Sequence, residues 1–133
     1  MKRRKHPTEA DEQAVVFSWA RLVANQWPEL HYMFHIPNGG HRNRIVAAKM
    51  TGQGVKPGVP DIFLPISRGN YHGLWIEMKA GHGGTVSDAQ AAWIDYLRAQ
   101  GYSVCVARGA EMAIGAITVY LTGESCPTKP TNG

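Results

Sequence analysis

The chain has 133 residues, of which 44% are hydrophobic, so it is long enough for one domain with a modest core and too short for two. Its 14 Lys and Arg against 10 Asp and Glu give a formal net charge of +4, which favours a nucleic-acid partner. Two distant cysteines, Cys105 and Cys126, argue against a zinc site and a disulfide framework, and no apolar run reaches membrane length.

The first half of the chain predicts two helices and one strand. A helix is expected from Thr8 to Gln26, because a core-facing stripe recurs at helical spacing and Trp27-Pro28 would end it. A strand is expected over residues 31–36 and a short helix over residues 44–51. A glycine-rich loop then leads to Asp61. The stripe of the first helix consists of Glu12, Val16, Trp19 and Val23.

An antiparallel hairpin is predicted next. Residues 61–66 and 74–80 are two apolar runs, and the turn-forming residues 67–73 join them. Side chains alternate along the second run, so Glu77 and Lys79 point to the same face. The pairing would bring Asp61 beside Glu77.

This trio has the chemistry of a metal-dependent phosphodiesterase. Two adjacent carboxylates repel one another unless a cation or a shared proton relieves them, and Mg²⁺ prefers such hard oxygen ligands. Lys79 would then orient or deprotonate an attacking water. The alternative is a solvated Glu-x-Lys ion pair and a Pro-Asp turn opener. The apolar setting of Glu77 favours a site, because burial makes charge costly.

The second half of the chain predicts a helix, a strand and a last helix. The helix spans residues 87–100, the strand residues 102–107 and the last helix residues 110–121. Together with the hairpin they predict an α/β fold with a mixed sheet flanked by helices. Ser87-x-x-Gln90 is a capping box for the first of these helices. The side chains that we expect to point inward from it are Ala89, Trp93, Tyr96 and Leu97.

Three segments together resemble the VRR-NUC family of the PD-(D/E)xK nuclease superfamily. They are Gly54–Asp61, Ile76–Lys79 and Ser87–Gln90, the last followed by Trp93, Leu97 and Gly101. The likeness runs from about Glu9 to Leu121. It implies a restriction-endonuclease-like core, divalent-metal-dependent cleavage of DNA, and a homodimer that works on branched DNA.

The resemblance also implies roles for individual residues. Asp61 and Glu77 would be metal ligands, the carbonyl of Met78 an extra ligand, and Lys79 the water-activating residue. The family uses an acid from its first helix, here Glu9 or Glu12. We favour Glu12, which continues the core-facing stripe, although acids at a helix N-terminus also favour its positive dipole.

Further residues have two interpretations each. Gln90 would lie near the active site by resemblance, whereas the capping box alone explains it. Asn38 matches a family loop and could bind a phosphate, whereas Asn-Gly is also a common turn. A basic arm over residues 1–7 either contacts DNA or is a solubilising tail. Residues 8–122 form the expected domain, and residues 123–133 are expected to be disordered. The basic residues expected to line the DNA path before Asp61 are Arg42, Arg44, Lys49 and Lys56.

Two functional hypotheses follow. The first is a DNA endonuclease that uses Mg²⁺ or Mn²⁺ on Asp61 and Glu77 and acts on four-way junctions or flaps. The second is a DNA-binding module of the same fold without catalysis. No nucleotide cofactor is expected, because the glycines near Gly52 lack the Lys-Ser/Thr ending of a phosphate loop. Without a visible signal peptide or membrane span, we expect a soluble protein in the cytoplasm of a bacterial or phage-infected cell.

Overall fold

The computed structural model describes residues 6–37 and 43–123 and contains one four-stranded mixed sheet. The strand order is β1 (Phe34–His35), β2 (Ile62–Leu64), β3 (Leu74–Lys79) and β4 (Ser103–Arg108). β1, β2 and β3 pair antiparallel in turn, and β3 pairs parallel with β4. The predicted hairpin and the predicted α/β class are therefore confirmed.

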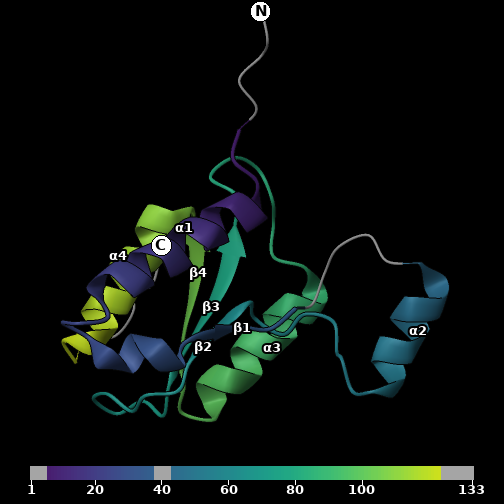
Figure 1. The fold of residues 1–133 in the computed structure, drawn as a ribbon. Coiled ribbons are helices and arrows are strands. Elements are labelled where there is room, and N and C mark those ends of the chain that lie inside the picture. The colour runs from purple at the N-terminus through teal and green to yellow at the C-terminus, as the bar shows by residue number, and fades with distance from the viewer. Residues whose placement is uncertain (1–5, 38–42, 124–133) are drawn as a thin grey trace, which may run out of the picture.

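Helices cover both faces of this sheet (Figure 1). α1 (Glu9–Val23) and α4 (Ala110–Leu121) pack together on one face, and α3 (Asp88–Ala99) lies on the other. α2 (Arg44–Gly52) projects from the body. No helix in the described ranges, 6–37 and 43–123, has the length and apolar character needed to cross a membrane.

The two faces of β3 have different surroundings. Leu74, Ile76 and Met78 are almost fully buried in the main core, which also contains Val16 of α1 and Ile117 of α4. The alternate side chains point toward α3, where a smaller apolar cluster includes Ile94, Leu97 and Val104, with Trp75 packed against it. The period-two alternation thus places Glu77 and Lys79 on the α3 face of the sheet.

Two local predictions differ from the structure. The first two residues of the expected strand over residues 31–36 belong instead to a 3₁₀ helix, η1 (Pro28–Tyr32), because Pro28 at its first turn fixes a helical φ. Only Phe34–His35 remains as strand. In α3, Tyr96 is 58% exposed and Ala89 is exposed, while Gln90, Ile94 and Leu97 form the inward row at helical spacing.

The remaining helices match the sequence pattern. Thr8 caps α1 through a capping box with Asp11, and Ser87 caps α3 through the predicted box with Gln90. Asn38, Arg42, most of the basic arm and the tail beyond residue 123 lie outside the described residues.

Candidate active site

Asp61 follows buried Pro60 and stands where β2 begins to pair with β3. Its Oδ2 accepts a hydrogen bond from the Met78 backbone N–H at 2.7 Å, next to the last β2–β3 pair, Ile62 with Ile76. The Asp61 side chain thus takes the position of a backbone ladder acceptor. Because the N–H and C=O of one strand residue point to the same edge, the Met78 carbonyl also faces the Asp61 side.

The backbone of Asp61 is fixed from β1. His35 Nδ1 lies 2.7 Å from the Asp61 carbonyl oxygen, and the Ile36 N–H donates to the same oxygen at 2.8 Å. Sequence analysis did not single out His35, because it lies 26 residues away and only the β1–β2 pairing brings it here.

Glu77 and Lys79 lie buried on the α3 face of β3, 2% and 6% exposed. Lys79 Nζ is 3.8 Å from Glu77 Oε1. Gln90 joins them: its Nε2 donates to Glu77 Oε1 at 2.7 Å, and its Oε1 accepts from Lys79 Nζ at 2.9 Å. The same Oε1 accepts from the Ser87 N–H at 2.9 Å, so Gln90 closes the capping box and contacts the site at once. The capping-box interpretation of Gln90 is confirmed, and its role in an active site stays a prediction.

The carboxyl groups of Asp61 and Glu77 both have pKa values above their ordinary range. Burial, and then the nearby charge of Asp61, raise the pKa of Glu77 to about 8, against the opposing effect of Lys79. Burial also raises the pKa of Asp61. In addition, Glu77 Oε2 is buried without a hydrogen-bond partner within the described residues. A buried acceptor of this kind is costly unless a proton or a cation satisfies it.

The donor set suits a hard divalent cation. It offers the oxygens of Asp61 and Glu77, with the Met78 carbonyl on the same side, and Mg²⁺ commonly binds one or two carboxylates together with water. Within the described residues, no three His, Cys, Asp or Glu side chains gather into a metal-holding group. A cation here would therefore complete its shell with water or substrate oxygens.

The structure distinguishes the two acids of the first helix. Glu12 Oε2 accepts a hydrogen bond from the Ala110 N–H at 2.6 Å, and so caps α4, whose N-cap Gly109 has no side chain to do so. Glu9 instead acts on the site, since its charge raises the pKa of both Asp61 and Glu77. Glu12, which we favoured, therefore has a structural contact elsewhere, and Glu9 is the first-helix acid whose charge affects both carboxyl groups.

A glycine loop lies next to the site and is held by an arginine that sequence analysis did not select. Arg108 Nη1 donates to the carbonyls of Gly83 and Gly84, both at 3.0 Å. A Cβ on Gly84 would lie 3.7 Å from Lys79 Cδ and 4.0 Å from Glu9 Oε1. Arg108 is the strand partner of Lys79, so the parallel β3–β4 pairing brings the loop and the site together.

The basic residues expected to contact DNA are exposed. Arg44 and Lys49 lie on α2, and Lys56 lies on the loop between α2 and Asp61. The described contacts do not join any of them to the carboxylate pair.

Comparison with known proteins agrees with this fold. The model of the VRR-NUC domain matches residues 7–111. A solved structure named "VRR_NUC domain protein" is 34% identical, covers 91% of this chain and 93% of its own, and superposes with a TM-score of 0.76. No curated protein matches the chain. The fold and the matches define a nuclease-type domain. The chain belongs to the VRR-NUC domain family.

Proposed function

We propose that this chain is a divalent-metal-dependent DNA endonuclease that hydrolyses phosphodiester bonds. The observation that carries the proposal is the trio of half-buried Asp61 with buried Glu77 and Lys79. In it one oxygen of Glu77 has no partner among the described residues, and the pKa of Glu77 is raised to about 8. A buried carboxyl whose pKa is perturbed by desolvation together with a specific charge partner is a candidate for a functional site.

Asp61 and Glu77 would hold Mg²⁺, or Mn²⁺ in its place, with the Met78 carbonyl as a further ligand. When bound, the cation supplies positive charge for the scissile phosphate and acidifies a bound water. The Met78 N–H keeps the Asp61 carboxylate oriented, and burial of Glu77 keeps competing water away from its oxygens.

Lys79 supplies a positive charge that is already in position. Gln90 fixes Nζ through a 2.9 Å hydrogen bond, and the Gln90 amide is itself fixed by the first turn of α3. An ammonium held in this way would orient the attacking water and stabilise the negative charge that develops on the phosphate, without reorganisation during the reaction. Attack of water on phosphorus, with departure of the 3′ oxygen, leaves a 5′-phosphate.

DNA would approach over the exposed basic residues Arg44, Lys49 and Lys56, which precede Asp61 in the chain. Phosphate contacts of this kind position the duplex without reading its sequence. We further propose a homodimer acting on branched DNA, either four-way junctions or flaps, since one domain of this size covers little DNA and a two-fold pair presents two sites.

The test is cleavage of labelled four-way junction, flap and linear duplex DNA in Mg²⁺, Mn²⁺ or EDTA. Wild type should cut at least one substrate with metal and none in EDTA. Lys79→Met, which keeps the side-chain length, should lose cleavage while its circular dichroism stays native. Lys49→Met is the matched control, because Lys49 is an exposed lysine away from the trio and its loss should affect DNA binding alone.

Two results would overturn the proposal. Cleavage by Lys79→Met at the wild-type rate would remove Lys79 from the chemistry. Salt-sensitive binding to all three DNAs, with no cleavage in either metal, would instead indicate a DNA-binding module of the same fold.

A further inference from the structure

Lys79 is held at three points along its length. The Gly109 N–H donates to its backbone carbonyl at 3.0 Å, and Gln90 accepts a hydrogen bond from its Nζ at 2.9 Å. Between these points the glycine loop (residues 80–86) lies against the aliphatic stem, where a Cβ on Gly84 would be 3.7 Å from Lys79 Cδ. Because the stem of a lysine is flexible and its ammonium is strongly hydrated, each of these contacts restricts where the charge can lie.

The glycine loop depends on Arg108 for its position. The loop is mostly exposed, and residues 81–86 make no backbone-to-backbone hydrogen bond within the described ranges. Arg108 Nη1 instead donates to the carbonyls of Gly83 and Gly84. Hydrogen bonds from a charged donor are stronger than those between neutral groups, so one side chain on β4 can hold a loop that has no ladder of its own.

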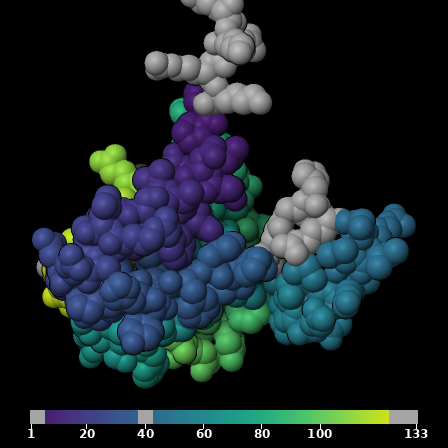
Figure 2. All heavy atoms as spheres, in the orientation of Figure 1, coloured from purple at the N-terminus to yellow at the C-terminus, as the bar shows by residue number. Residues whose placement is uncertain are grey.

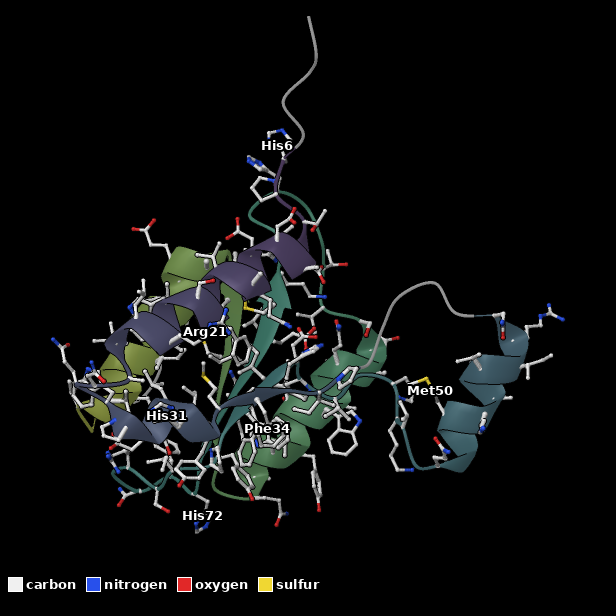
Figure 3. All side chains as sticks on the ribbon, viewed as in Figure 1. His6, Arg21, His31, Phe34, Met50 and His72 are labelled. Atoms are coloured by element: carbon white, nitrogen blue, oxygen red, sulfur yellow. The ribbon has the colours of Figure 1, made fainter. Side chains whose placement is uncertain are left out.

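A ring contact adds little to this hold. The rings of His82 and His6 have centroids 4.2 Å apart, and His6, labelled in Figure 3, stands just before α1. Both residues are exposed, so their contact removes little surface from water. Arg108 is therefore the main link between the loop and the sheet.

Arg108 occupies a position that is unfavourable for its charge. It is the β4 partner of Lys79, and paired side chains stand on the same face of the sheet. Like charges at paired positions repel one another, and no ion pair joins Arg108 to a carboxylate within the described residues. An arginine here is poor for stability alone, which indicates that its use lies in the contact it makes with the loop.

We propose that Arg108 is a positioning residue for Lys79. It keeps the glycine loop on the lysine stem, so that the ammonium stays beside Glu77 and bulk water stays away from the stem. With the loop released, the stem is open to water and free to change rotamer. The ammonium then spends less time where it orients the attacking water and stabilises charge on the phosphate. This role rests on the proposed nuclease function, whereas the loop contact itself does not depend on it.

The first test measures how readily Lys79 reacts with an acylating reagent, in EDTA and without DNA. The full chain is exposed briefly to an N-hydroxysuccinimide ester, and mass spectrometry of its peptides gives the rate at each lysine. Arg108→Met should raise the rate at Lys79 at least about tenfold, because two hydrogen bonds from a charged donor no longer hold the covering loop. Exposed Lys49 is the internal reference, and its rate should not change, since it lies on α2, which Figure 2 shows as a lobe that protrudes from the body.

Arg98→Met is the matched control for the arginine. Arg98 Nη2 also donates to a backbone carbonyl, that of Val104 at 3.0 Å, but Val104 lies toward the other end of β4 from the glycine loop. This variant should leave the acylation of Lys79 at the wild-type rate.

A second pair of variants acts on the loop itself. Gly84→Ala places a side chain at a φ of +76°, which disfavours the loop conformation, and should raise the acylation of Lys79 as Arg108→Met does. Gly81→Ala should not, because Gly81 has no positive φ and its added Cβ would meet no atom within 4 Å.

Steady-state cleavage of DNA in Mg²⁺ tests the catalytic consequence. Arg108→Met should lower kcat roughly tenfold and leave KM nearly unchanged, because the loop acts on Lys79 and not on the binding of DNA. Arg108→Lys keeps the charge on a side chain that is shorter and lacks the planar fork, so it should resemble Arg108→Met in both assays.

Three results would overturn the role of Arg108. They are acylation of Lys79 at the wild-type rate in Arg108→Met, a raised KM with unchanged kcat in that variant, and wild-type kcat in Arg108→Lys. The second would make Arg108 a DNA contact, and the third would assign its effect to charge alone. A wild type that cuts no DNA while the variants show the acylation difference overturns the nuclease proposal and leaves the loop contact standing.

Discussion

The buried carboxyl of Glu77 should make the stability of the metal-free protein depend on pH. Replacing Glu77 with glutamine should abolish this dependence. Glutamine keeps the shape of the side chain and its contact with Gln90, but it cannot ionise. In wild type the Glu77 pKa is about 8 in the fold against an ordinary 4.5. The folded state therefore holds the proton more tightly than the unfolded state, and the free energy of unfolding falls as the pH rises between these values.

The size of the effect follows from the same two pKa values. Within the interval the loss is about 1.4 kcal/mol per pH unit, and over the whole interval it approaches roughly 5 kcal/mol. Glu77 is only 2% exposed, so solvent screening reduces this little. A small domain has roughly 5–15 kcal/mol of stability in total, so the loss should be readily measurable.

The assay is urea unfolding followed by circular dichroism from pH 5 to pH 8 in EDTA. The difference in stability between wild type and Glu77→Gln should change steadily with pH, in favour of the variant at high pH. Glu111→Gln, which removes an exposed carboxyl from α4, should follow wild type. Parallel curves for wild type and Glu77→Gln would refute the reasoning. Added Mg²⁺ should reduce the wild-type loss, because a cation favours the ionised carboxyl.

Three other substitutions test the surroundings of the trio. Glu12→Gln should lower the free energy of unfolding by about 1 kcal/mol, because it weakens the cap of α4, and should change metal affinity little. Glu9→Gln should change metal affinity and leave the free energy of unfolding nearly unchanged. Thermal melts measure the stability of the two variants, and metal titration measures their affinity. Gly58→Ala should lower the free energy of unfolding more than Gly54→Ala does, and should slow DNA cleavage. Both glycines have positive φ, but only at Gly58 would a Cβ lie 2.6 Å from the Ala89 backbone. Equal urea midpoints for the two variants would contradict this packing. Mg²⁺ binding near pH 7 should release close to one proton, mainly from Glu77, and calorimetry in buffers of different ionisation enthalpy measures it; no release would mean that Glu77 is already ionised.

The sequence was sufficient for the features that depend on short-range pattern. Period-two alternation and the turn-rich linker placed Glu77 and Lys79 on one face and paired them with the Asp61 strand, as the structure has it. The capping box at Ser87 was equally legible, because its partners are three residues apart. Both kinds of signal rest on local geometry, which one sequence carries in full.

Features that depend on packing between distant elements were beyond such patterns. The choice between Glu9 and Glu12 depends on where α1 packs against α4, because Glu12 accepts a hydrogen bond from the N–H of Ala110, 98 residues away in the sequence. Helical spacing alone placed Tyr96 inward, whereas the phase of α3 is fixed by Gln90 in the site and by Ile94 and Leu97 against β4. His35 was missed for a similar reason, because only the two-residue strand β1 brings it to Asp61.

The pairing of β2 with β3 holds the repelling carboxyl groups of Asp61 and Glu77 in place. The Asp61 carboxylate accepts a hydrogen bond from the Met78 N–H, in the place where a backbone carbonyl of a paired strand would otherwise accept it. The spacing of the two acids is therefore set by the β2–β3 register. A one-residue slip would turn Glu77 into the apolar core and Met78 toward α3, and the burial of Leu74, Ile76 and Met78 opposes that slip. The apolar face of β3 thus stabilises the strand, and the opposite face of the same strand holds the Glu77 carboxyl at a pKa of about 8. Burial of the apolar face therefore keeps the two repelling acids together before any cation binds.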